Sequence, residues 1–151
     1  MSILALLALA AGAAIAIQAT MNAQLGVVLK NSILATCIAF LLSLIITLFV
    51  MLITTKQYPN LSDIKAVPIY LWCGGALSAF GVGMFYYLIP KMGAGSVMSY
   101  ALTGQLVIAL LASHFGWFNL PANSIDSIKT IGAALLIIGV LLINWRTGNV
   151  N

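Results

Sequence analysis

The stretch 33-ILATCIAFLLSLIITLFVMLI-53 decides the fold, because it runs for 21 residues without a charged side chain. A helix rises about 1.5 Å per residue, so a run of this length crosses the roughly 30 Å of hydrocarbon in a bilayer. Similar runs fill the rest of the 151-residue chain, which is 63% hydrophobic and 5% charged. So few charges cannot cover a water-soluble domain. The sequence therefore predicts an all-α, polytopic membrane protein.

Apolar runs of spanning length predict five transmembrane helices in a single domain over residues 1–151. The expected helices cover about residues 3–29, 33–53, 68–89, 95–113 and 128–145. No connecting segment is long enough to hold a soluble domain, and the two short ones force their neighbouring helices to be antiparallel. The first apolar run lacks a positively charged start and continues past any plausible cleavage point. We interpret it as a retained first helix rather than a signal peptide.

The loop cations are divided evenly between the two sides of the membrane. On the N-terminal side lie Lys56, Lys65 and Lys129, and on the other side lie Lys30, Lys91 and Arg146. An even division provides no positive-inside bias, which normally sets orientation. Two explanations fit equally: chance in a chain with few charges, or a dual topology in which copies insert both ways and pair antiparallel. The cations form no cluster typical of a nucleic-acid interface, so no nucleic-acid partner is expected.

Polar side chains interrupt the apolar runs at helical spacing. Gln18 and Asn22 are four residues apart, so they share one face of the first helix. On the same half of the bilayer, hydroxyl groups and one phenol follow the second and fourth helices. They are Ser32, Thr36, Ser43, Thr47, Ser96, Ser99, Tyr100 and Thr103, and Gln105 lies on another face of the fourth helix. These groups either hydrogen-bond between helices, contributing about 0.6 kcal/mol each, or line a polar cavity for a substrate.

No acidic or basic side chain lies deep inside an expected span. An embedded carboxylate is the usual device for proton-coupled export of cations, so its absence argues against an antiporter of permanent cations. Cys37 and Cys73 fall in apolar segments and are expected to be packing residues. His114 is the only histidine, and the sequence shows no metal-ligand spacing, no nucleophile–base pair and no phosphate loop. We expect neither an enzyme nor a bound metal or cofactor.

Small residues recur on the third and fifth expected helices at spacings that let a neighbouring helix approach closely. They are Gly75, Ala79 and Gly83 on the third helix, and Gly132 and Gly139 on the fifth. We predict that these faces serve helix packing or a dimer interface.

The order of short motifs along the chain resembles the YdcZ-like family of the drug/metabolite transporter superfamily. The motifs are Q-x-x-x-N from Gln18, W-x-G-G from Trp72, P-x-x-G-A from Pro90, T-G-Q-L from Thr103, H-F-G-W-F from His114 and the glycine pattern of the fifth helix. The resemblance implies a multi-pass exporter of the bacterial inner membrane. Ten-helix relatives contain two five-helix repeats of inverted topology, which implies that a five-helix chain pairs with an antiparallel copy.

In that architecture the first, third and fourth helices line a central pathway. The resemblance thereby places five residues on the pathway, namely Gln18, Asn22, Tyr100, Thr103 and Gln105. Two features depart from the related families. An Asp often precedes the H-F-G run, where this chain has Ser113, and the glutamate of small multidrug resistance transporters has no counterpart in the first helix.

We therefore expect a transporter that exports a small neutral, zwitterionic or amphiphilic solute by alternating access as an antiparallel homodimer in the lipid bilayer. The candidate solute-binding residues are Gln18, Asn22, Tyr86, Ser99, Tyr100, Thr103 and Gln105, with the two tyrosines contributing aromatic faces. Two alternatives stay open. One is a multidrug exporter that binds cationic aromatic compounds through aromatic faces, and the other is a non-transporting subunit that pairs with a paralogue.

Overall fold

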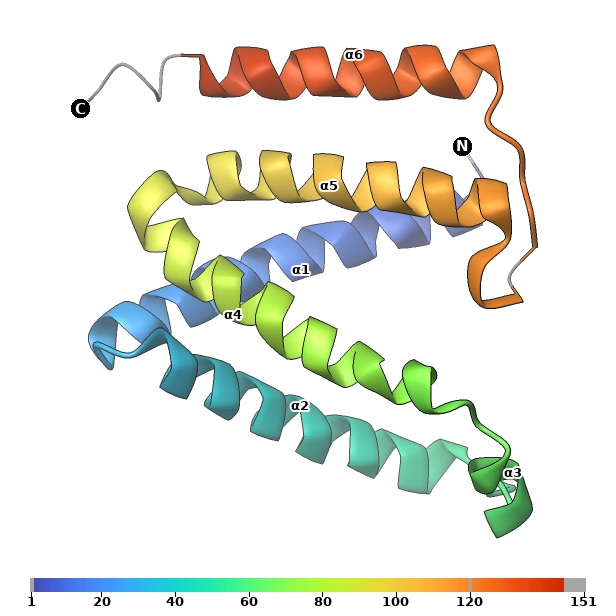
Figure 1. Cartoon of the computed structure of the whole chain (residues 1–151). Coiled ribbons are helices and arrows are strands. Elements are labelled where there is room, and N and C mark those ends of the chain that lie inside the picture. Colours follow the sequence, from blue (N-terminus) through green and yellow to red (C-terminus); the bar gives the residue numbers. More distant parts are fainter. Residues whose placement is uncertain (1, 120, 146–151) are drawn as a thin grey trace. The chain divides into compact units, whose positions relative to one another are not determined.

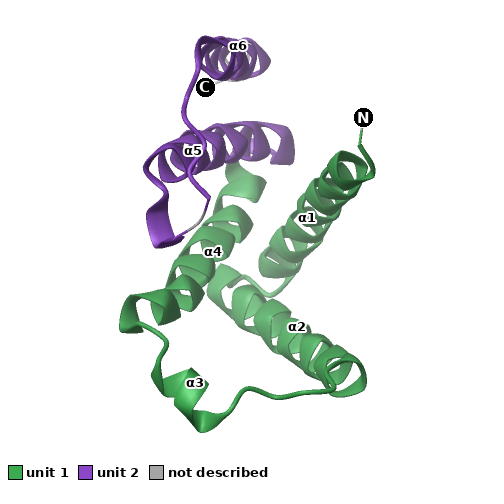
Figure 2. Ribbon diagram, turned by 90° about the vertical axis from the view of Figure 1, so that its right-hand side faces the viewer, with its two compact units in different colours: residues 1–91 green, residues 92–151 purple. Residues whose placement is uncertain are grey.

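The computed structural model describes residues 2–119 and 121–145, so Arg146 lies outside the described residues. All regular structure in these ranges is helical, and they contain no strand. Five helical spans of the described chain are long and apolar enough to cross a membrane, which confirms the predicted all-α membrane fold. They are Ile3–Val28, Ser32–Thr54, Ile69–Met92, Ala94–Phe115 and Ser127–Asn144. The chain divides into two compact units, unit 1 (residues 1–91) and unit 2 (residues 92–151) (Figure 2).

In unit 1, α1 (Ile3–Val28) and α2 (Ser32–Thr54) form a hairpin whose helices diverge from a tight turn (Figure 1). Asn31 begins α2 by accepting a hydrogen bond from the backbone N–H of Leu34 at 3.0 Å. Gly26 allows the close crossing beside the turn, because a Cβ added there would lie 3.2 Å from the Cα of Ser32.

Small residues form the buried faces of this hairpin. Ala19, Ala23 and Gly26 are buried on α1, and Ala35 and Thr36 are buried on α2. Small side chains let two helix backbones approach closely in a membrane, where apolar side chains gain nothing by leaving lipid. The two helices therefore approach closely beside the α1–α2 turn.

The third span has a more complex start and end than the sequence predicted. It begins as the 3₁₀ helix η1 (Ile69–Cys73), with Pro68 at the N-cap, and continues as α4 (Gly74–Met92). Pro90 lies inside α4, although a separator was expected to begin there. Because Pro90 lacks an N–H, only the helical hydrogen bond to the Tyr86 carbonyl is lost, and α4 continues for two further residues.

A short helix, α3 (Leu61–Lys65), lies in the loop between α2 and η1 and was not expected from the sequence. It begins with a capping box, in which the backbone N–H of Asn60 donates to the Asp63 carboxylate at 2.9 Å.

In unit 2, α5 (Ala94–Phe115) and α6 (Ser127–Asn144) run in opposite directions (Figure 1). The connecting loop contains the 3₁₀ helix η2 (Trp117–Asn119), and it returns to the end of α5. There the His114 Nδ1 accepts a hydrogen bond from the Ile125 N–H at 3.2 Å. Asp126 then begins α6 by accepting the Lys129 N–H at 2.8 Å.

Candidate functional site

Three polar side chains from α1 and α4 form one hydrogen-bonded group, which we term the amide–tyrosine cluster: Gln18, Asn22 and Tyr86. The Asn22 Nδ2 donates to the Gln18 Oε1 at 2.8 Å and to the Tyr86 Oη at 2.8 Å. The Tyr86 hydroxyl donates to the Gln18 Oε1 at 3.1 Å. The i, i+4 spacing of the two amides brings them together on α1, as the sequence indicated. All three were predicted as solute-binding residues, and the structure places them in mutual contact.

The cluster lies inside the membrane span. Gln18 is about 15 Å along the helix axis from the end of α1 at Val28, counted at 1.5 Å per residue. Tyr86 is only 2% exposed and is the largest fully buried side chain of the described residues. Polar groups at such a depth are unfavourable unless they are paired. The Tyr86 hydroxyl satisfies this requirement by both donating and accepting.

The hydrogen bonds couple the orientations of the Gln18 and Asn22 amides. Its Oε1 accepts two hydrogen bonds, one from Asn22 and one from Tyr86, which uses both lone pairs of that oxygen. Reversing both amides together would keep all three contacts, with the Gln18 Nε2 as the donor to Asn22 and Tyr86. In either arrangement, one end of the Gln18 amide makes no hydrogen bond with the described residues and remains available.

A cavity of about 270 Å³, termed the polar cavity, adjoins the cluster. It is lined by Gln18, Ala39, Phe40, Ser43, Val82 and Tyr86, and none of these carries a charge. The Ser43 hydroxyl makes no hydrogen bond with the part of the chain that the structure describes. The polar cavity therefore presents an amide and a hydroxyl with open hydrogen-bonding capacity.

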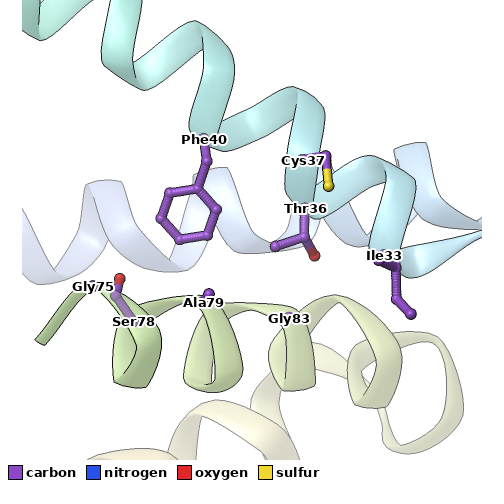
Figure 3. Close-up of a pocket in the computed structure, with 8 residues that line it drawn as sticks. All are labelled: Ile33, Thr36, Cys37, Phe40, Gly75, Ser78, Ala79 and Gly83. Atoms are coloured by element: carbon purple, nitrogen blue, oxygen red, sulfur yellow. The ribbon is translucent and has the colours of Figure 1, made fainter. Parts of the chain in front are cut away.

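A second cavity of about 530 Å³, termed the apolar groove, lies between α2 and α4 (Figure 3). Its lining comprises Ile33, Thr36, Cys37 and Phe40 from α2, and Gly75, Ser78, Ala79 and Gly83 from α4. The α4 side includes the three small residues predicted to pack against another helix. A Cβ at Gly83 would lie 3.6 Å from the Thr36 Oγ1, whereas a Cβ at Gly75 would meet no atom within 4 Å. The groove thus widens from Gly83 toward Gly75.

Phe40 connects the two cavities, since it contributes to the lining of both. Figure 3 shows its ring pointing from α2 toward α4, in the direction of Ser78 and Ala79. The polar cavity and the apolar groove therefore adjoin each other at this ring.

The remaining predicted solute-binding residues lie on α5 in unit 2. Ser99 donates to the Ser96 carbonyl at 2.9 Å, and Thr103 donates to the Ser99 carbonyl at 3.0 Å. Tyr100 is 46% exposed and Gln105 is also exposed. The two hydroxyls are thus satisfied within α5, whereas Tyr100 and Gln105 present their side chains to the surface of the unit.

Asn144 of α6 is a polar residue to which sequence analysis gave no site role. Its Nδ2 donates to the Ser99 Oγ at 2.9 Å and to the Val140 carbonyl at 2.8 Å. Its Oδ1 is buried without a hydrogen-bond partner among the described residues. The only sequence signal was the isolated polar residue at the end of an apolar helix, which is also typical of an interfacial position.

The predicted interface glycines of α6 are open in this single chain. A Cβ at Gly132 or at Gly139 would meet no atom within 4 Å. Cys37 and Cys73 are free, exposed thiols. Across residues 2–119 and 121–145, no group of three or more His, Cys, Asp or Glu residues is arranged to hold a metal ion.

The sequence matches the family model described as "Putative inner membrane exporter, YdcZ" over residues 3–142. The matched range includes the whole amide–tyrosine cluster and both cavities. No curated protein and no solved structure matches the chain significantly.

Proposed function

The chain belongs to the YdcZ family of inner membrane exporters, and from this premise we propose that it binds its solute at the amide–tyrosine cluster and the adjoining polar cavity. It is a multi-pass inner membrane protein and a membrane transporter. The observation that carries the proposal is a hydrogen-bonded cluster inside a span, next to a cavity, with one end of the Gln18 amide still unpaired. Structural hydrogen bonds alone would not require a cavity at that place.

The proposed solute is small and neutral, zwitterionic or amphiphilic. No charged side chain lines either cavity, so the protein has no fixed charge there to balance an ion of opposite sign. On α5, a second proposed contact surface for the solute consists of Ser99, Tyr100, Thr103 and Gln105. A multidrug exporter of cationic aromatic compounds is less consistent with these linings, because no carboxylate is among them.

The proposed mechanism is alternating access by an antiparallel homodimer. Three observations support it: the family resemblance to half of a ten-helix transporter, the even division of loop cations, and the open faces at Gly132 and Gly139. In such a dimer, two copies of the cluster are related by a two-fold axis in the membrane plane. Rocking of one copy against the other would expose the clusters to opposite sides in turn.

Reporters on the two termini test the dimer. One reporter functions only inside the cell and the other only outside, and both are measured on each terminus in the same cells. Comparable activity on both sides is the expected result. A single orientation would exclude the antiparallel homodimer and would favour pairing with a separate partner of opposite topology.

Cysteine labelling tests the site. Gln18→Cys and Asn22→Cys, each in a Cys37→Ala, Cys73→Ala background, should react with a small water-soluble maleimide in native membranes. Ile17→Cys is the matched control, because Ile17 is next to Gln18 on an exposed apolar face, 62% open in the single chain. Labelling at 18 and 22 without labelling at 17 is expected, whereas inert thiols at both sites would leave only a helix-packing role.

A further inference from the structure

We infer that His114 is a pH-sensitive latch at the loop end of the α5–α6 hairpin. While its imidazole is neutral, it holds the segment before α6, termed the α6 lead-in (residues 121–126), against the end of α5. Protonation of the ring removes this contact and releases the lead-in. The inference goes beyond the proposed solute site, because it concerns unit 2 alone and the proton is the ligand.

The hydrogen bond at His114 shows which protonation state the structure contains. The Ile125 backbone N–H can only donate, so the His114 Nδ1 accepts, at 3.2 Å. An imidazole nitrogen has a free lone pair only in the neutral ring, since both nitrogens of an imidazolium carry protons. A reversed ring would place a carbon-bound hydrogen against the same N–H and leave that donor without an acceptor. The observed contact therefore belongs to the neutral ring with its proton on Nε2.

Few contacts hold the lead-in against α5. Beside the latch, the Asn123 N–H donates to the Ser113 carbonyl at 2.8 Å. The Lys129 Nζ donates to the Asn123 Oδ1 and to the Ser124 carbonyl, both at 2.6 Å, but Lys129 belongs to α6 and these bonds do not reach α5. Across the described residues, two hydrogen bonds thus join the lead-in to α5, and only the one at His114 depends on protonation.

The backbone that returns the chain to α5 is strained. The turn after α5 begins at Gly116, whose φ of 61° suits glycine, but Phe118 and Asn119 also have left-handed φ values, 59° and 60°. Residues with a Cβ rarely adopt this conformation, and a bulky side chain makes it less favourable. The lead-in is therefore held against local backbone preference, so the loss of one of its two hydrogen bonds to α5 favours release.

The surroundings of His114 allow the ring to respond to acid. The side chain is exposed, and histidine is the residue that ordinarily changes charge between about pH 5 and 8. Neither α5 nor η2 carries Asp, Glu, Lys or Arg, so the charged groups beside the latch are Asp126 and Lys129 at the start of α6. The Asp126 carboxylate already accepts the Lys129 N–H, at 2.8 Å. Protonation therefore turns an acceptor into a cation in a segment that already binds the Lys129 ammonium.

Amide exchange with water tests the latch at the bond itself. The full chain is labelled with ¹⁵N in dodecylphosphocholine micelles, and protection factors are measured at pH 8 and pH 5, which removes the intrinsic pH dependence of exchange. The Ile125 protection factor should fall about two- to tenfold at pH 5, as expected for the loss of one hydrogen bond. The Leu34 N–H is the matched control, because it donates to the Asn31 side chain, an acceptor that does not titrate. Its protection factor should stay constant.

Two substitutions of His114 separate the acceptor from its charge. His114→Asn places an amide oxygen at the branch position of the Nδ1, and this oxygen accepts at both pH values. Ile125 should then stay protected at pH 5. His114→Leu removes the acceptor, so protection should be low at both pH values.

Release of the lead-in is measured separately, by the mobility of a nitroxide on Ser124→Cys in a Cys37→Ala, Cys73→Ala background. Its electron paramagnetic resonance spectrum should sharpen between pH 8 and pH 5, and this change should be absent when His114→Asn is added. The matched label is Gln57→Cys, in the loop of unit 1 between α2 and α3, and its spectrum should not change.

Three results would overturn the inference. One is an Ile125 protection factor that does not change with pH in the parent chain, and another is a pH response that persists in His114→Leu. The third is a response of Ile125 without any change at the Ser124 label, because the hydrogen bond would then open without releasing the lead-in.

Discussion

The two units each join a pair of helices by amide–hydroxyl hydrogen bonds, but they leave different atoms unpaired. In unit 1, the unpaired groups are the outer ends of the Gln18 and Asn22 amides, and Gln18 lines a cavity. In unit 2, the unpaired atom is the Oδ1 of Asn144, which is enclosed by protein. The same kinds of side chain therefore have different consequences in the two units. An unpaired group beside a cavity can bind a ligand, whereas an unpaired atom without access only lowers stability.

The contrast predicts that the free energy of unfolding depends more on the amide–tyrosine cluster than on the Ser99–Asn144 pair. We order the tests by the expected size of their effects. In each, unfolding is followed by circular dichroism during titration with sodium dodecyl sulfate in mixed micelles.

Tyr86→Ala should have the largest effect. Removing a fully buried aromatic ring leaves a cavity and typically lowers the free energy of unfolding by about 3–5 kcal/mol. Tyr87→Ala is the matched control, because the adjacent Tyr87 is 46% exposed and should change stability by about 1 kcal/mol or less. Equal effects at both positions would show that Tyr86 does not hold α4 against the hairpin.

Asn22→Leu should have the second largest effect. The substitution removes both hydrogen bonds donated by the Asn22 Nδ2 while the Tyr86–Gln18 bond can persist. Membrane hydrogen bonds contribute about 0.6 kcal/mol on average and up to about 1.7, so we expect a loss of about 1–2 kcal/mol. No measurable loss would mean that the cluster forms without stabilising unit 1.

The sequence predicted the spans and the pairing of Gln18 with Asn22, because apolar length and i, i+4 spacing are local properties. It could place Tyr86 on the right helix but could not bring it to this pair. The two partners of the Asn22–Tyr86 bond are 64 residues apart, and their approach depends on how α4 packs against the hairpin. The sequence analysis missed Phe40 for a related reason. An aromatic residue within an apolar run looks like any other membrane-spanning residue, so the sequence does not indicate that it lines two cavities.

Asn144→Leu should have a smaller effect than Asn22→Leu, and it should change the free energy of unfolding by no more than about 0.5 kcal/mol in either direction. It removes the hydrogen bond to Ser99, which is worth about 0.6 kcal/mol, and a hydrogen bond to the Val140 carbonyl within its own helix. It also removes a buried carbonyl oxygen that has no partner, and that relief offsets the loss. A loss above about 1 kcal/mol would contradict this balance and would show that the Oδ1 is paired in the membrane.

Thr47→Val in unit 1 and Thr103→Val in unit 2 should have the smallest effects, within about 0.5 kcal/mol of the parent protein. Each hydroxyl donates to a carbonyl of its own helix, and valine keeps the branched shape.

Stability alone therefore cannot reveal whether Thr103 contacts a solute. The second measurement is the rate of solute transport in proteoliposomes. If Thr103→Val leaves stability unchanged but slows transport at least tenfold, whereas Thr47→Val changes neither, unit 2 contributes to solute binding. Equal transport by both variants would confine the hydrogen-bonding role to the amide–tyrosine cluster and the other polar residues of α5.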